Sequence, residues 1–157
     1  MTAEPLDERI DRALDGVEDP EVAITLRDLG VLRDVRRQGT TVTVRMVPTR
    51  MACPGRDEMA RRVRAAVHDV DPQLEVDIDW DLTSWSAGDI SPHGCGVLRS
   101  EGYTAQDDAI TCPYCDGDDV RRAAEFGGAL CKIPYHCRSC GSTFERLAGA
   151  ALPVLTT

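Results

Sequence analysis

Four cysteines late in the sequence form two C-x-x-C pairs. The first pair is Cys112 and Cys115, the second is Cys137 and Cys140, and 21 residues separate the two pairs. Two such pairs can place four thiolates at the corners of a tetrahedron, which is the geometry of a closed structural zinc site. The spacing is close to that of zinc ribbons. We therefore expect these residues to hold one structural zinc ion, and iron or a cluster is the alternative for four thiolates.

Cys53 is the main candidate for chemistry in the first half of the chain. Pro54 follows it, and proline favours the first position of a helix, so Cys53 is expected at or next to the N-cap of a helix that runs to Val70. The helix dipole and the free backbone N–H groups would favour a thiolate there. Such a thiol suits a nucleophile, a persulfide carrier or a ligand of a soft metal. A cysteine that only packs in the core is an equally good interpretation.

Three carboxylates and a hydroxyl lie close to Cys53 in the predicted topology. Asp19, Glu21 and Asp28 surround a turn, and Thr49 ends a predicted strand four residues before Cys53. Strand ends and helix starts of open α/β sheets gather on one edge, so these groups could meet in one pocket. The alternative, which the residues alone favour somewhat, is that Asp19 and Asp28 only stabilise turns.

Hydrophobic periodicity predicts an α+β fold of two parts. Helical spacing of apolar residues and strict alternation predict a small α-β-β-α-β domain with a mixed sheet over residues 1–82, its two helices on one face. No clear period follows, so a linker with some local structure is expected over 83–109. The rest is expected as a zinc ribbon over 110–148, with short strands within 121–126 and 135–147, and a tail over 149–157.

Composition limits the possible partners. The formal net charge is −9, from 18 basic and 27 acidic residues, which disfavours nucleic acid. Lys132 is the only lysine, for which genome composition is the simplest explanation. No apolar run is long enough for a membrane span, and the acidic N-terminal segment has no apolar core, so no signal peptide is expected. Seven cysteines without an export signal favour metal or redox use in a reducing cytoplasm.

Several motifs together resemble a known family. Asp19-Pro20-Glu21, Asp28-Leu29-Gly30 and Pro48-Thr49-Arg50-Met51-Ala52-Cys53-Pro54 resemble the signature of the small iron–sulfur assembly domain of SufT and of cytosolic iron–sulfur targeting factors. The segment 85–91, the Cys112-Pro113-x-Cys115 pair and the stretch 126–137 make nearly the whole chain similar to the PaaD or PaaJ family of phenylacetate degradation. Asp89 departs from that pattern, because a second tryptophan is expected there.

The resemblance implies an accessory protein rather than an independent enzyme. Such a protein would mature iron–sulfur or iron sites of the multicomponent oxygenase that epoxidises the ring of phenylacetyl-CoA. Oxygenase or reductase subunits, other iron–sulfur proteins and a second copy of the chain are the implied partners. Cys53 would be the key thiol and could carry a transient cluster, with Asp19, Glu21, Asp28 and Thr49 around it. The alternative is a docking protein whose ribbon and acidic surface bind the oxygenase or its reductase without chemistry.

Overall fold

The first half of the chain folds as predicted. The computed structural model describes residues 3–49, 53–82, 85–105, 109–125, 127 and 132–147. Its first elements are α1 (Leu6–Asp15), β1 (Leu32–Gln38), β2 (Thr41–Met46), α2 (Arg56–Val70) and β3 (Glu75–Trp80). The predicted α-β-β-α-β order is therefore confirmed. Among these described residues, no helix has both the length and the apolar character that a membrane span needs.

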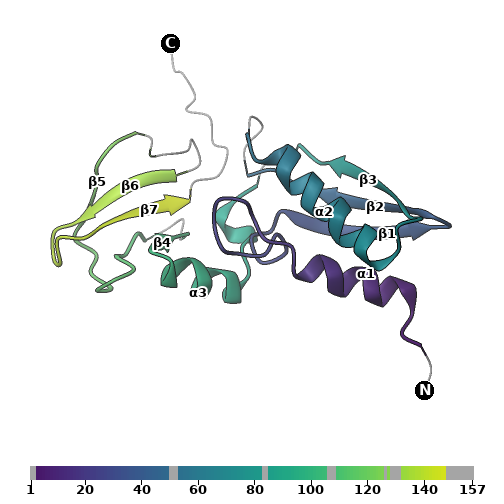
Figure 1. Ribbon diagram of the computed structural model, residues 1–157. Helices are drawn as coiled ribbons and strands as arrows, with labels where there is room; N and C mark the ends of the chain where they lie inside the picture. Colours follow the sequence, from purple (N-terminus) through teal and green to yellow (C-terminus); the bar gives the residue numbers. More distant parts are fainter. Residues whose placement is uncertain are drawn as a thin grey trace, which may run out of the picture.

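A three-stranded mixed sheet forms the centre of this part. Its strand order is β1-β2-β3, with β1 antiparallel to β2 and β2 parallel to β3. The parallel pair follows from the connection through α2, and the antiparallel pair from a tight turn at Gly39, whose φ is +60°. Helices α1 and α2 lie beside each other against one face of the sheet (Figure 1). Alternation along β2 buries Val42, Val44 and Met46.

The segment expected as a linker contributes to the core of the first part. Its described residues contain a short 3₁₀ helix η1 (Ala87–Asp89), helix α3 (Pro92–Ser100) and strand β4 (Tyr103–Thr104). Trp85 is only 2% exposed and belongs to the same core cluster as Leu98. The indole Nε1–H of Trp85 donates to the carbonyl oxygen of Leu29 over 2.8 Å. This segment is therefore packed onto the first sheet and its loops.

The last part is a small four-stranded sheet. Strands β5 (Val120–Arg122), β6 (Lys132–Cys137) and β7 (Thr143–Leu147) join β4 in the order β4-β7-β6-β5, with β4 parallel to β7 and the other pairs antiparallel. Among the residues that the structure describes, its core has four buried members, namely Cys112, Tyr135, Cys137 and Phe144. A core this small is typically stabilised by an added constraint, which a bound metal would supply.

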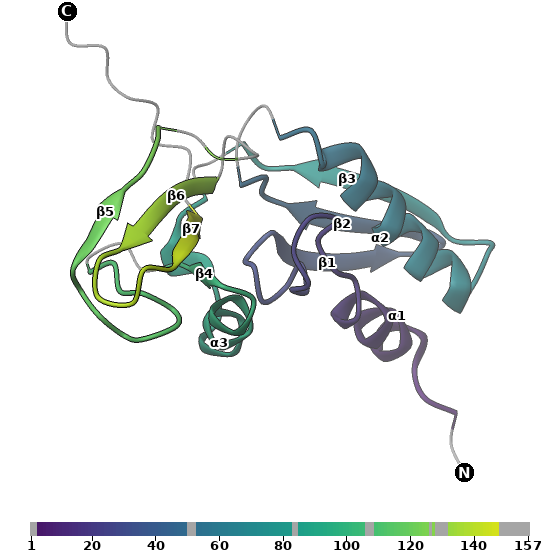
Figure 2. The ribbon, with the colours of Figure 1, turned by 60° about the vertical axis from the view of Figure 1, so that its left-hand side comes forward.

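The two parts share a boundary (Figure 2). Leu147, at the end of β7, is 5% exposed and belongs to the large core of the first part, together with Ala105 from the intervening segment. Arg99 of α3 contacts the metal-site end of the chain, because its Nη2 donates to the carbonyl oxygen of Cys112 over 3.0 Å. The small sheet is therefore fixed against the first part through both α3 and β7.

Candidate functional site

The four cysteines of the two C-x-x-C pairs come together at one end of the small sheet. The sulfur atoms of Cys112, Cys115, Cys137 and Cys140 all lie within 4.8 Å of one another. The separation is 3.7 Å for Cys112 and Cys140, and 3.6 Å for Cys115 and Cys137. A tetrahedral zinc ion with Zn–S bonds of about 2.3 Å requires a sulfur–sulfur separation of about 3.8 Å. The donor set and its spacing therefore fit a structural zinc ion.

The protonation of this cluster also calls for a cation. The backbone N–H of Gly117 lowers the pKa of Cys115, but burial and hydrogen bonds to the three other thiols outweigh it and raise that pKa to about 12. The hydroxyl and backbone N–H of Ser142 lower the pKa of Cys140 to about 6. A cation between the four sulfur atoms would favour their thiolate forms. Cys131, the cysteine between the pairs, is outside the described residues.

Cys53 lies two residues before the N-cap of α2, so its predicted place at or next to the N-cap is wrong by one residue. Gly55 is the N-cap, because Pro54 and Gly55 form a turn before the helix begins at Arg56. The carbonyl oxygen of Cys53 accepts the Arg56 N–H over 3.3 Å. A Cβ atom at Gly55 would lie 3.7 Å from the Cys53 sulfur, so the glycine leaves one side of the thiol uncrowded.

The Cys53 side chain is half-buried at the edge of the large core and faces a pocket. This pocket, which we call the thiol pocket, is small, with a cavity volume of about 30 Å³. Besides Cys53, its lining residues are Asp19, Pro20, Glu21, Val22, Thr49, Gly55, Trp85, Lys132 and Leu147. Three of the four expected companions of Cys53 therefore line the same pocket, and Asp28 is not among its lining residues.

Asp19 closes the turn at one wall of the thiol pocket. One carboxylate oxygen accepts the backbone N–H groups of Glu21 over 2.9 Å and of Val22 over 3.1 Å. Burial raises the pKa of Asp19, although these two hydrogen bonds act against it. The charge of Glu21 raises that pKa further, whereas the charge of Lys132 lowers it. The two interpretations of Asp19 are therefore compatible, since it stabilises a turn and also presents a carboxyl group with raised proton affinity to the pocket.

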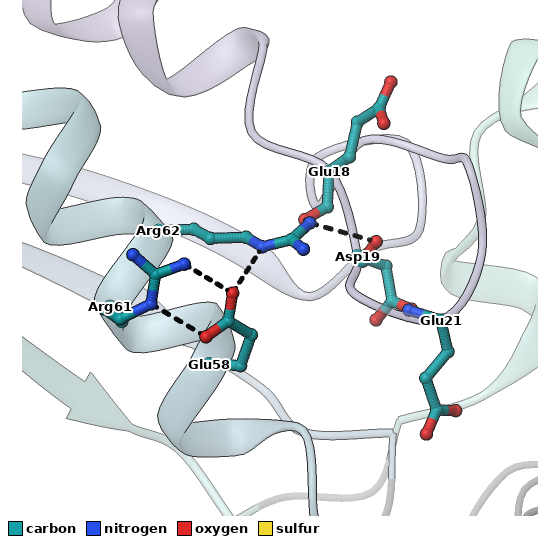
Figure 3. Close-up of polar contacts among 6 residues, drawn as sticks. All are labelled: Glu18, Asp19, Glu21, Glu58, Arg61 and Arg62. Atoms are coloured by element: carbon teal, nitrogen blue, oxygen red, sulfur yellow. Dashed lines mark hydrogen bonds and ion pairs between the residues drawn. The ribbon is translucent and has the colours of Figure 1, made fainter.

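An arginine of α2 fastens this turn to the helix that follows Cys53 (Figure 3). Arg62 Nη1 donates to the carbonyl oxygens of Glu18 over 3.1 Å and of Asp19 over 3.4 Å. Its Nε donates to Glu58 over 2.9 Å, and hydrogen bonds from Arg61 and then Arg62 lower the pKa of Glu58 to about 2. Sequence reasoning missed Arg62. The sequence shows the i, i+4 pair of Glu58 and Arg62. It does not show that Arg62 also bonds to a turn 43 residues earlier.

Asp28 is committed to a different set of bonds. Its carboxylate accepts the Ser91 hydroxyl over 2.5 Å and the Thr25 hydroxyl over 3.1 Å, and it lies 3.0 Å from Nδ1 of His93. The hydroxyl of Ser91, followed by His93 and Thr25, holds the pKa of Asp28 below its usual value against a smaller effect of burial. Ser91 donates to Asp28 and not to His93, so these residues are not arranged as a nucleophile and its base. Their role here is to bind the loop at Asp28 to the start of α3.

Lys132, which begins β6 in the small sheet, is a lining residue that sequence reasoning did not place in the site. Its ammonium group donates to the Tyr103 hydroxyl over 3.3 Å and lies 5.2 Å from the centre of the Tyr103 ring. Burial lowers the pKa of Lys132, but the Tyr103 hydroxyl and the charges of Glu145 and Glu21 outweigh it, so the net effect is a raised pKa. Lys132 is therefore a cation at neutral pH.

The described residues of the thiol pocket do not form a ready-made metal cage. Within the described part of the chain, the four-cysteine cluster is the one group in which three or more ligand atoms lie within 4.8 Å of one another. Of the cysteines that the structure describes, Cys53 is the one that lines the pocket. A cluster usually takes four protein ligands, so most of the ligands of a cluster at Cys53 would have to come from outside this pocket.

Comparisons with known proteins agree with both parts of the structure. Residues 7–79 match the family model described as "Iron-sulfur cluster assembly protein", and residues 99–148 match the "PaaD zinc beta ribbon domain". A relative from Escherichia coli (strain K12) is named as the putative D component of 1,2-phenylacetyl-CoA epoxidase. It is 27% identical over 143 residues, which are 84% of this chain and 86% of the relative.

Among solved structures, the fold resembles a domain of unknown function, DUF59, from Bacillus anthracis. The TM-score is 0.51 and the identity is 21%, and the match covers 57% of this chain and 87% of that one. A conserved hypothetical protein from Thermotoga maritima has a TM-score of 0.48 and 24% identity, covering 64% of this chain and 97% of that one. The first of these supports the assignment of the α+β fold.

Proposed function

Because this chain is PaaD-like, with an iron–sulfur cluster assembly domain followed by a PaaD zinc ribbon, we propose that it is a maturation factor for iron–sulfur centres of a multicomponent aromatic-ring oxygenase. The system of the phenylacetyl-CoA epoxidase is the first candidate, since the E. coli relative carries that name. The observation that carries the proposal is the position of Cys53. Its half-buried thiol lines a small pocket together with Asp19 and Glu21 and is not fully sealed in the core.

The thiol pocket offers a few weak ligands rather than a permanent site. Cys53 can supply one thiolate to iron, or its thiolate can attack the outer sulfur of a donor protein's persulfide and become a persulfide itself while the donor's thiolate leaves. Asp19, whose pKa is raised, can exchange a proton near that sulfur at a less acidic pH than a typical aspartate. Cargo held by one thiol of this chain is easily passed to a site with four ligands, as a delivery protein requires.

The test is to measure the cluster content of the partner. The chain is co-expressed with the iron–sulfur reductase of its oxygenase system, and iron and acid-labile sulfide are determined for each purified reductase. With Cys53→Ser, we expect the reductase to contain no more cluster than when the chain is left out. Cys95→Ser is the matched control, because Cys95 is an exposed cysteine outside the pocket, and it should leave loading unchanged. A fully loaded reductase beside a folded Cys53→Ser chain would refute the proposal.

A docking protein is the second candidate, supported by the acidic surface and the separate metal-stabilised sheet. The net charge of −9 suits a partner with a basic face. Pull-down of the oxygenase or reductase separates the two functions. A docking protein loses the complex when a zinc ligand is replaced and keeps full function with Cys53→Ser, whereas a maturation factor with Cys53→Ser still binds its partner but leaves it without cluster.

A further inference from the structure

The thiol pocket is built by both parts of the chain. Most of its lining residues come from the first part and the segment that follows it, but two come from the small sheet, namely Lys132 and Leu147. They are register partners, because Lys132 at the start of β6 pairs with Leu147 at the end of β7. One pair of strand ends therefore supplies both a cation and an apolar side chain to the wall of a pocket whose thiol belongs to the other part.

The opposite end of the same strand carries a zinc ligand. Strand β6 runs from Lys132 to Cys137, so the residue in the pocket wall and the residue in the four-cysteine cluster are the first and last of one strand. Between them the small core depends on Tyr135, which stacks on Phe144 of β7 with ring centres 5.8 Å apart. Loss of the metal therefore loosens the two strands that present Lys132 and Leu147 to the pocket.

We propose that Lys132 and Leu147 are site residues of the thiol pocket, and that the zinc ribbon acts as its movable wall. Lys132 sets the charge beside Cys53, and Leu147 limits access to the thiol. Zinc at the four-cysteine cluster keeps both side chains in place. This inference rests on the proposed function, because it describes the surroundings of Cys53. It does not concern the delivery of a cluster, so the inference and the proposed function can fail separately.

Several contacts hold Lys132 at this boundary. The Tyr103 hydroxyl and ring fix its ammonium group, and Tyr103 packs against the large core. The charges that act on the Lys132 ammonium group include Glu21, from the wall of the pocket beside Cys53, and Glu145 of β7, from its own sheet. Its positive charge is thus placed to offset part of the negative charge of Asp19 and Glu21 in the pocket wall, so the charge beside Cys53 depends on both parts of the chain.

The first experiment reads the charge beside Cys53 directly. Cys53 is labelled with two disulfide reagents of similar reactivity, one dianionic (dithiobis-nitrobenzoate) and one neutral (dithiodipyridine), in a chain with Cys95→Ser and Cys131→Ser and with zinc bound. Lys132→Met should lower the ratio of the anionic to the neutral rate by about fivefold, as expected for one charge acting across a partly solvated pocket. Lys132→Arg should restore the ratio. An unchanged ratio in a folded Lys132→Met chain would overturn the role of Lys132.

The second experiment reads access to the thiol. Leu147→Ala should raise both rates together by severalfold without changing their ratio, because it removes apolar bulk and no charge. Reversible removal of zinc from the full chain by a chelator should raise the rates more, and added zinc should reverse the change. The zinc experiment uses the chain with Cys95 in place. Labelling of Cys53 is followed on the tryptic peptide 51–56, and labelling of the exposed Cys95 on peptide 65–99 serves as the reference.

Two results would overturn the movable wall. One is a Cys53 labelling rate that is the same with and without zinc, relative to Cys95. The other is a Leu147→Ala chain, folded by its circular dichroism, in which neither reagent reacts faster. Either result would leave the proposed function standing, since cluster delivery is measured separately on the partner.

Discussion

We expect Gly30→Ala to be far more destabilising than Gly39→Ala, although both glycines have a left-handed backbone. The φ angle is +76° at Gly30 and +60° at Gly39. A Cβ atom at Gly30 would lie 2.4 Å from the carbonyl oxygen and 2.9 Å from the carbonyl carbon of Asp89, whereas at Gly39 nothing lies within 4 Å. Gly39→Ala therefore measures the backbone cost alone, and Gly30→Ala adds a collision with main-chain atoms that cannot rotate away.

The magnitudes follow from what the collision displaces. The left-handed conformation costs alanine about 1 kcal/mol relative to glycine, so we expect Gly39→Ala to lose about that much. At Gly30 the Asp89 main chain must move, and the segment 85–91 with it. That movement strains the buried bond from Trp85 to Leu29, worth about 1 kcal/mol, and part of the burial of an indole whose complete loss costs about 3–5 kcal/mol. We expect a total loss of about 3 to 4 kcal/mol.

Urea unfolding followed by tryptophan fluorescence suits this comparison. The two tryptophans of the chain, Trp80 and Trp85, both report on the first core. The free energy of unfolding is compared for the wild type, Gly39→Ala and Gly30→Ala. Equal losses for the two variants would show that segment 85–91 does not press on the loop at Gly30, and the described packing of Trp85 into the wall of the thiol pocket would then be wrong.

Two further predictions concern the metal site and a half-buried carboxylate. Cys137→Ser should abolish stoichiometric zinc binding, which is measured by release of zinc to a chromogenic chelator. It should also lower the unfolding free energy of the first core by about 2 kcal/mol, because Leu147 is no longer held in that core. Retained zinc, or no change in that free energy, would contradict the shared core. Asp28→Asn should cost about 2 kcal/mol at pH 7, measured by urea unfolding. Because the folded pKa of Asp28 is lowered, its carboxylate stabilises the fold above the unfolded pKa near 3.8, and this contribution disappears as the pH falls through the folded value. The difference between wild type and variant should therefore shrink below about pH 4, and a difference that does not vary with pH would contradict the assigned bonds.

Regular periodicity explains why much of the fold was predictable. The apolar spacing within α1 and the alternation along β2 and β3 are regular, so these elements and their inward faces could be predicted. The segment 85–105 has no such period, because its elements are very short and contain several glycines. Its structure depends on contacts with a loop 56 to 65 residues earlier, such as Trp85 with Leu29 and His93 with Asp28. Such contacts leave no local pattern in the sequence.

The thiol pocket was only partly predictable for a similar reason. Asp19, Glu21, Thr49 and Cys53 belong to one part of the chain, and the topology of its sheet edge was enough to group them. Asp28 was grouped with them on the same argument, but its turn faces the start of α3 instead. Lys132 was noted as a compositional oddity, and nothing in its own neighbourhood links it to Cys53. Its place in the pocket depends on how the two sheets pack together.

The packing of the two sheets against each other makes the thiol pocket depend on residues beyond the assembly domain. The B. anthracis structure covers 57% of this chain, so much of the chain lies outside that match. A chain cut at residue 82 would keep Cys53, Asp19 and Thr49 but would lose Trp85, Lys132 and Leu147 from the same pocket. The isolated assembly domain would thus present a thiol with an open, more acidic surrounding, because the cation and two apolar walls are gone. If the zinc ribbon is the wall that we propose, a chain cut at residue 82 should label at Cys53 faster than the full chain and should lose the preference for the anionic reagent that Lys132 confers.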